Sequence, residues 1–527
     1  MRRRTVMVAA MLAACGRAPA PRARLGTALP AIAHEDRAYA GRIAQPLDPS
    51  RLAALAGFVE LARAQARVPG VAIAIVDHGQ VVLAHGFGVR QLGRPEPVTP
   101  DTLFLIGSTT KPLTTLMMAR LVDEQRFAWD SPLEALAPGL ARPGQALPGQ
   151  ALPGQALPGL TVAHTVCACS GMPGDGGELI FAYAAATPEQ RIAELARRPP
   201  SAAPGRVFQY SNAMFAAGGY WAAHTVWPAL RIGDAYDLAM QRYVFAPLGM
   251  ASTTFDVRVV EARDHATPHG RTRALDHVAI PLADEQMVDA IRPAAGAWSS
   301  AADLARYLAL ELADGRDRGG ARLVSAASLH RRRAPMVRVG GRTSYGLGLF
   351  VEDDHGVTIV GHGGNTFGFS TDLFFLPDAG IGAVILTNAG FDRTLPDVVR
   401  QRLLELVFGA PDRASRALRD AVARRDAAAA RALVDATPAL PPALAARLVG
   451  RYANPQLGSI TLARLGGYVV LDVGEWRSRV ALAAGQTLVL LDPPAVDTEL
   501  HLEPRAGGRL ALGVDEGGQH YTFAPVD

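Results

Sequence analysis

The spacing of apolar and polar residues predicts a helix, a β-hairpin and a second helix in the N-terminal part of the chain. Residues 52–68 place apolar side chains at helical spacing. Residues 71–76 and 81–85 are rich in β-forming residues and flank an Asp-His-Gly-Gln turn, which is typical of a hairpin. Residues 108–125 carry apolar side chains all around the helix, so this helix should lie inside a core.

The C-terminal half predicts more strands and a change of texture. Residues 357–360, 373–376 and 381–386 predict neighbouring strands joined by turns. Residues 412–440 are rich in Ala and Arg and predict a helical connector. Residues 441–527 alternate short β-rich runs with Gly turns, which predicts a small all-β module.

One internal segment has low complexity. Residues 145–159 are three copies of Gln-Ala-Leu-Pro-Gly. A proline in every fifth position excludes both a continuous helix and a strand ladder. We therefore expect an exposed and dispensable loop expansion.

Composition excludes several classes of protein. The chain has 527 residues, of which 49% are hydrophobic and 19% charged, so it is neither disordered, nor collagen-like, nor a polytopic membrane protein. Its length allows one large domain and a smaller one. The net charge is +4, and Arg2, Arg3 and Arg4 supply three positive charges at one end. No basic stripe remains to neutralise phosphates, so we predict no nucleic-acid partner.

The N-terminus has the features of an export signal. Arginines 2–4 precede an apolar run that is too short to span a bilayer, which needs about 20 residues. Residues 12–16, Leu-Ala-Ala-Cys-Gly, resemble a bacterial lipobox. We therefore predict a signal peptide over 1–14, a lipidated Cys15, a tether over 15–45, and a periplasmic protein anchored in the membrane by lipid. An ordinary cleaved signal with an incidental cysteine is the alternative, and the twin arginines leave Sec and Tat export both open.

Two more cysteines lie in the body of the chain. Cys167 and Cys169 are two positions apart, a spacing that disfavours a disulfide between them. With His164 they could be read as a metal cluster, but no fourth ligand at a recognisable spacing follows. We expect two buried thiols, no metal and no cofactor.

The basic residues point to one position. Lys111 is the only lysine of the chain, and every other cationic side chain is arginine. A guanidinium cannot lose its proton at working pH, whereas an amine can, so a lysine required as a base cannot be replaced by arginine. Ser108 lies three residues earlier, on the same face of the predicted helix. The helix N-terminus and burial both lower the pKa of such an amine.

Two further segments fit the same chemistry. Tyr210 and Asn212 stand in the run Phe-Gln-Tyr-Ser-Asn, where a Tyr can carry a proton and an Asn amide can hold the lysine and the substrate. His362, Gly364 and Asn365 follow the strand at 357–360, and glycines at a strand edge allow close approach of a substrate.

The three motifs Ser-x-x-Lys, Tyr-x-Asn and His-x-Gly, in this order, resemble the serine β-lactamase and penicillin-binding-protein superfamily. The match is to its class C-like branch, which includes esterases and D-aminopeptidases. The resemblance covers about residues 50–410 and places the domain at 46–411. It implies an α/β (α+β) fold, an antiparallel sheet flanked by helices with a helical subdomain, and 441–527 is similar to the β-barrel modules of some relatives.

The resemblance also implies roles for the motif residues. Ser108 would be the nucleophile of an acyl-enzyme, and Lys111 and Tyr210 would share acid and base work. Asn212, His362 and Gly364 would line the pocket for a small-molecule or short-peptide substrate. The backbone N–H groups of Ser108 and Asn365 would form the oxyanion hole. The sequence does not specify an oligomeric state.

Departures from the family pattern bear on the substrate. His362 stands where a lysine would bind the carboxylate of a β-lactam, so an ester, amide or D-amino-acid peptide is favoured. Residues 167–171 read Cys-Ala-Cys-Ser-Gly where the family has Thr-His-Thr-Ser-Gly. A class C-type β-lactamase or DD-peptidase is the alternative enzyme. A cell-wall sensor that is acylated without turnover is the alternative outside catalysis.

We predict that Cys15 carries the membrane anchor. The wild-type protein should partition into detergent, and Cys15→Ser should move to the aqueous phase because a diacylated cysteine anchors where a single chain would not. Cys169→Ser is the matched control and should partition like the wild type. Wild-type protein found only in the aqueous phase would show that Cys15 is not lipidated.

Overall fold

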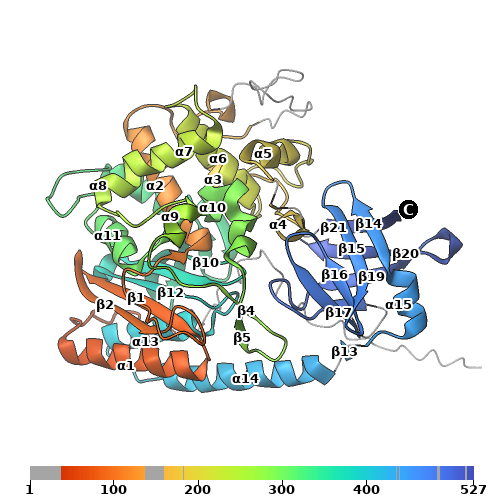
Figure 1. The fold of residues 1–527 in the computed structure, drawn as a ribbon. Helices are drawn as coiled ribbons and strands as arrows, with labels where there is room; N and C mark the ends of the chain where they lie inside the picture. Colours follow the sequence, from red (N-terminus) through yellow and green to blue (C-terminus); the bar gives the residue numbers. More distant parts are fainter. Residues whose placement is uncertain are drawn as a thin grey trace, which may run out of the picture.

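The computed structural model describes residues 37–136 and 159–526, apart from 182, 185, 435, 438, 484–486, 517 and 518. The predicted signal peptide, Cys15 and nearly all of the repeat at 145–159 lie outside these residues. Figure 1 shows a large body of sheet and helices beside a smaller all-β module. No helix in this part of the chain has the length and apolar character needed to cross a membrane.

A single antiparallel sheet of eight strands forms the centre of the large body. Its order is β2-β1-β12-β11-β10-β9-β8-β7, so the predicted strands of the 357–386 region are neighbours, as expected. The strands are β1 Gly70–Asp77, β2 Gln80–Gly88, β7 Val337–Gly340, β8 Thr343–Tyr345, β9 Phe350–Asp354, β10 Val357–Asn365, β11 Ser370–Leu376 and β12 Ile381–Thr387. Every residue of β11 and β12 is buried, because helices cover both faces of the sheet.

One face is covered by α1, Pro49–Gln65, and α13, Thr394–Val407. Asp48 begins α1 by accepting a hydrogen bond from the N–H of Arg51, with Pro49 in the first turn where no donor is needed. Buried residues of α1 recur at helical spacing and pack under the sheet: Leu55, Phe58, Val59 and Ala62. The helix α14, Ala414–Val434, continues along this side toward the small module (Figure 1).

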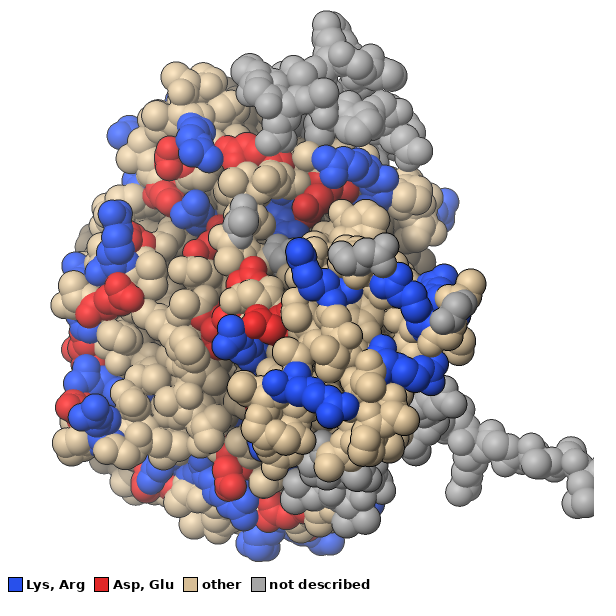
Figure 2. All heavy atoms as spheres, turned by 45° about the vertical axis from the view of Figure 1, so that its right-hand side comes forward, with Lys and Arg blue, Asp and Glu red and all other residues tan. Residues whose placement is uncertain are grey.

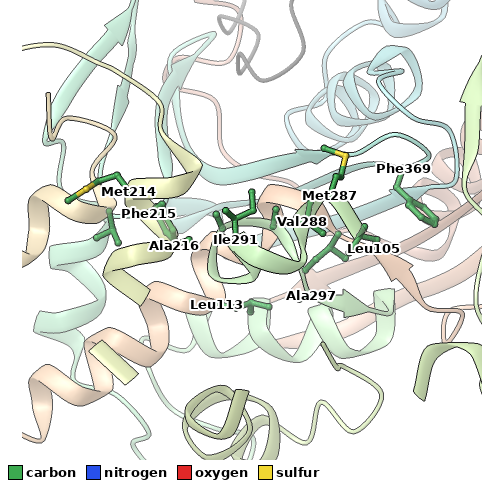
Figure 3. Close-up of a cluster of buried hydrophobic side chains, with 14 of the residues drawn as sticks. Leu105, Leu113, Met214, Phe215, Ala216, Met287, Val288, Ile291, Ala297 and Phe369 are labelled. Atoms are coloured by element: carbon green, nitrogen blue, oxygen red, sulfur yellow. The ribbon is translucent and has the colours of Figure 1, made fainter. Parts of the chain in front are cut away.

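The other face carries the helices that surround the candidate site. The helix α2, Thr110–Asp123, is buried on nearly all sides, as its sequence predicts. Figure 3 shows Leu113 of α2 beside residues from α6, Asn212–His224, and from the 3₁₀ segment η4, Leu282–Ile291. The other helices are α3 Val162–Val166, α4 Glu178–Phe181, α5 Pro188–Ala196, α7 Ile232–Met240, α8 Ala246–Leu248, α9 Val257–Glu261, α10 Arg292–Ala295, α11 Ala301–Leu312 and α12 Ala326–Arg333.

Short strand pairs complete the large body. β3, Phe104–Leu105, pairs with β6, Trp298–Ser299, and β4, His269–Arg271, pairs with β5, His277–Ala279. The first pair leads directly into the turn that carries Ser108.

The C-terminal module is a closed barrel, in agreement with the predicted all-β texture. Strands β14 to β21 pair in sequence, β14 pairs with β21, and β13, Ala436–Thr437, joins the edge of β17. The elements are α15 Pro442–Leu448, β14 Gly450–Asn454, β15 Gly458–Leu465, β16 Tyr468–Asp472, β17 Arg477–Ala483, β18 Thr487–Leu490, β19 Glu499–Pro504, β20 Leu510–Glu516 and β21 Gln519–Val526. Closure leaves few free strand edges, which suits so small a core.

The expectation of two free thiols is wrong. Cys167 and Cys169 form a disulfide, with Cα atoms 5.1 Å apart. Ala168 between them has φ of 50°, and this left-handed turn brings the two Cα atoms within disulfide range. The carbonyl groups of Ala168 and Cys169 accept the N–H groups of Gln209 and Gly205, so the bridged turn supports the chain that leads to Tyr210.

The basic side chains exposed at the surface are all of one type. Figure 2 shows basic and acidic side chains mixed over the large body, whereas the part on the right carries basic side chains with almost no acidic ones. Lys111 is only 1% exposed, so the basic groups on this surface are arginines.

A buried ion pair ties α2 to the helices behind it. The guanidinium of Arg332 on α12 donates to Glu311 on α11 at 2.6 Å and to the carbonyl of Pro112 on α2 at 2.6 Å. Both side chains are fully buried. Burial raises the pKa of Glu311, but Arg332 and Arg333 outweigh it and hold the pKa at about 2. The carboxylate is therefore charged at neutral pH and depends on its arginines.

We predict that Arg332→Met destabilises the protein by about 3–5 kcal/mol, because it leaves the Glu311 carboxylate buried with only part of its compensation. Equilibrium unfolding in urea measures the loss. Arg331→Met, which changes a half-buried neighbour on the same helix, should cost far less. Equal losses in the two variants would contradict this role for the ion pair.

Candidate active site

Ser108 lies in a single 3₁₀ turn, Gly107–Thr109, that runs directly into α2. The sequence predicts that the α-helix starts at Ser108, whereas it starts two residues later, because Gly107 enters the turn with φ of 52°. Thr109, the residue after Ser108, connects the turn to the sheet by hydrogen bonds. The hydroxyl of Thr109 lies 2.8 Å from that of Thr371 on β11 and 3.2 Å from the carbonyl oxygen of His362 on β10.

Lys111 points from α2 toward Ser108. Its Nζ lies 2.9 Å from Ser108 Oγ, 2.7 Å from Asn212 Oδ1 and 2.9 Å from the carbonyl oxygen of Ala294. No carboxylate of the described chain forms an ion pair with it. Burial lowers the pKa of Lys111 well below its ordinary value, and the negative charge of Asp175 opposes this only in part. The site thus favours the neutral amine.

Tyr210 completes the contacts of the serine. Its hydroxyl donates to Ser108 Oγ at 2.9 Å, from the segment that leads into α6. Burial raises the pKa of Tyr210, although the hydrogen bond with Ser108 lowers it in part. Tyr210 is therefore a neutral phenol, which can donate a proton but does not accept one readily.

His362 lies on β10 next to these groups and is uncharged. Its Nδ1 lies 2.6 Å from the carbonyl oxygen of Gly363, and its Nε2 lies 3.0 Å from the hydroxyl of Tyr345. The Nδ1–H tautomer satisfies both contacts, because Nδ1 then donates and Nε2 accepts. Burial is the main cause that lowers the pKa of His362 to about 3, and a proton on Lys111 would act in the same direction.

The end of β10 supplies a second backbone donor beside Ser108. Thr366 N–H donates to the carbonyl of Phe369 on the β11 side. Hydrogen-bonding directions alternate along an antiparallel strand, so the N–H of Asn365 faces the opposite edge. Pairing with β9 on that edge has already ended at Gly361. A side chain at Gly364 would collide with the carbonyl oxygen of Ile106 and lie 3.0 Å from the N of Ser108, so glycine permits this approach.

The structure thus brings together Ser108, Lys111, Tyr210, Asn212 and His362, and places Gly364 and Asn365 beside the serine. Two groups that were not predicted as site residues also belong here. Tyr345 binds His362; its run Tyr-Gly-Leu-Gly adds to the family resemblance, but the sequence alone did not place it in the site. The carboxylate of Asp175 accepts the N–H groups of Asn212, at 2.5 Å, and Ala213, at 2.9 Å. A lone aspartate in a Gly-rich run gives no signal for a cap on a helix 37 residues later.

No group of three or more His, Cys, Asp or Glu side chains within 37–136 and the described part of 159–526 is arranged to hold a metal ion. His164, the third member of the possible metal cluster, instead caps its own helix: its Nδ1 accepts the backbone N–H of Thr161 at 3.1 Å.

The sheet, the helical layer and this serine site agree with one known family of proteins. The Beta-lactamase family model matches residues 55–407, and the chain belongs to this family. It is 26% identical over 341 residues to an unguisins hydrolase of Aspergillus campestris, covering 62% of this chain and 59% of that protein. The chain therefore spans less than two thirds of that relative.

Two other proteins are similar over longer shares of their own length. Penicillin-binding protein 4 of Amycolatopsis lactamdurans is 27% identical over 364 residues, covering 65% of this chain and 87% of that protein. The octameric penicillin-binding protein homologue from Pyrococcus abyssi superposes with a TM-score of 0.56 at 24% identity, covering 90% of this chain and 96% of that chain. This structural match supports the fold of both bodies.

Proposed function

We propose that the protein hydrolyses an ester or peptide-like amide, including D-amino-acid peptides, through an acyl-enzyme on Ser108. The observation that carries the proposal is the contact of one hydroxyl, Ser108 Oγ, with a buried amine and a neutral phenol, each at 2.9 Å. Burying a charged lysine without an ion pair costs free energy of folding. The only lysine of the chain is nevertheless buried here, which indicates that the neutral amine has a catalytic role.

Acylation follows from this geometry. The neutral Nζ of Lys111 takes the proton of Ser108 as Oγ bonds to the carbonyl carbon of the substrate. The resulting oxyanion accepts hydrogen bonds from the N–H groups of Ser108 and Asn365. Tyr210 donates its proton to the leaving oxygen or nitrogen as that bond breaks, and recovers a proton from the Lys111 ammonium. Water then attacks the acyl carbon; the neutral Lys111 amine takes one proton from the water and returns it to Ser108 Oγ as the acyl bond breaks.

The electrostatics of the pocket favour an uncharged acyl group. A pKa of about 3 keeps His362 neutral above that pH, so it offers no fixed cation for a carboxylate. The guanidinium of Arg393, which lies beside Gly363, is already engaged by the carbonyl of Thr371 at 2.7 Å and by Asp397 at 2.9 Å. These contacts support an ester or peptide-like substrate over a β-lactam.

We further propose that the enzyme works outside the cytoplasm as a lipoprotein. The support is the basic and apolar N-terminus that ends in Leu-Ala-Ala-Cys. The disulfide between Cys167 and Cys169 also suits an oxidising compartment.

We predict that a fluorophosphonate forms one covalent adduct with the wild-type protein, seen by intact mass, and none with Ser108→Ala. Lys111→Arg should acylate about 10²–10⁴ times more slowly, because guanidinium cannot take the serine proton. Ser325→Ala, which removes a half-buried hydroxyl elsewhere, should react like the wild type. An adduct that persists in Ser108→Ala would refute the assignment, and nitrocefin turnover faster than that of p-nitrophenyl esters would overturn the substrate class.

A further inference from the structure

The C-terminal barrel packs against one segment of the large body, residues 174–181. The indole N–H of Trp476 donates to the carbonyl of Ile180 at 3.0 Å. The ring of Phe181 lies between Trp476 and Phe523, with ring centroids 6.0 and 5.4 Å away. Both contacts are buried, so this is a packed interface.

Strand β21 of the barrel holds both sides of Asp175. The side-chain amide of Gln519 donates to the carbonyl of Gly174 at 3.4 Å. On the other side, the carboxylate of Glu178 accepts the N–H of Gly176 at 2.9 Å and the hydroxyl of Tyr521 at 3.2 Å. Arg198 also binds Glu178. Glu178 is therefore the junction between Tyr521 and the backbone next to Asp175.

The same segment reaches the reacting groups in two further contacts. Asp175 accepts the N–H groups of Asn212 and Ala213 and so fixes the first turn of α6. The side-chain oxygen of Asn212 in turn accepts a hydrogen bond from Lys111 Nζ at 2.7 Å. The chain of contacts from Tyr521 to Lys111 thus runs through Glu178, Asp175 and Asn212 without a gap.

Close packing leaves this junction little freedom. A side chain at Gly176 would collide with the Tyr521 hydroxyl, so the loop lies directly against the barrel. Tyr521 is 2% exposed and Glu178 is 5% exposed. Movement of β21 must therefore be accompanied by movement of the loop that carries Asp175.

We propose that Tyr521 of the barrel is a positioning residue of the active site: through Glu178 it holds Asp175 in place, and Asp175 orients Asn212 and Lys111. The barrel then contributes to the rate of acylation, although Tyr521 itself does not contact Ser108. This proposal rests on the proposed acyl-enzyme function.

The pKa of Lys111 depends on the series of contacts from Tyr521 to Asn212. The charged and titratable groups that face the amine are Asp175, whose charge favours the ammonium, and the neutral side chains of Tyr210 and His362. If Asp175 moves away, its attraction for the ammonium weakens and the pKa of Lys111 falls. The acid limb of the acylation rate, which requires the neutral amine, then shifts to lower pH.

The test compares two tyrosines of the same barrel in the full-length protein. Tyr521→Phe removes the donor to Glu178. Tyr452→Phe is the matched control, because Tyr452 is also 2% exposed and donates to Leu448 within the barrel at 2.7 Å. The second-order rate of Ser108 acylation by a fluorophosphonate is measured from pH 5 to 10, with circular dichroism to verify folding. Tyr521→Ala and Tyr452→Ala form a second, larger pair.

We expect Tyr521→Phe to slow acylation about 3-fold to 10-fold, the size of one hydrogen bond, and to move the acid limb to lower pH. Tyr521→Ala should slow it further, whereas both Tyr452 variants should keep the wild-type rate and pH profile. Tyr521 variants that match their Tyr452 controls in rate and profile would overturn the positioning role and leave the proposed function standing. Failure of the wild type to acylate at Ser108 would instead overturn the proposed function.

Discussion

The chemistry of the site depends on the buried amine of Lys111, which is removed from water. Lys111 is enclosed by three uncharged partners, the hydroxyl of Ser108, the amide of Asn212 and the carbonyl of Ala294. Three acceptors satisfy an ammonium, but they do not neutralise it, and burial penalises its charge. The balance therefore favours a neutral amine that can accept the proton of the serine. An ion pair at this position would stabilise the ammonium and remove the base.

The rest of the fold keeps these partners at short range. Thr109 and Thr371 join the serine turn to the sheet, and Gly364 lets β10 approach it closely. Arg332 holds the start of α2 from behind through the carbonyl of Pro112. Asp175 fixes α6 so that Asn212 meets the lysine. The four contacts come from segments far apart in sequence, so the geometry of the site is a property of the whole domain.

The motifs were predictable because they rely on local spacing. Ser108 and Lys111 share a helical face, and the β-rich runs at 71–76 and 81–85 form the hairpin of β1 and β2. Asp175 and the strand β21 were not predictable from such patterns. The partners of Asp175 lie 37 and 38 residues away in the sequence. In β21, polar residues alternate with Tyr521 and Phe523, and Pro525 stands near its end. The Cys167–Cys169 disulfide was missed because it requires the left-handed backbone of Ala168, which alanine seldom adopts.

The central claim is that Lys111 is neutral when Ser108 is acylated, and one titration tests it directly. Because the chain has a single lysine, protein made with [¹³Cε]lysine gives one Cε signal in an NMR spectrum, and its shift follows the protonation of Nζ. The same sample yields the pH dependence of Ser108 acylation by a fluorophosphonate. The account predicts a lysine midpoint well below the roughly 10.4 of a free side chain, coinciding with the midpoint of the acid limb of acylation. A lysine that titrates near that ordinary value while acylation is already at full rate at pH 7 would contradict it.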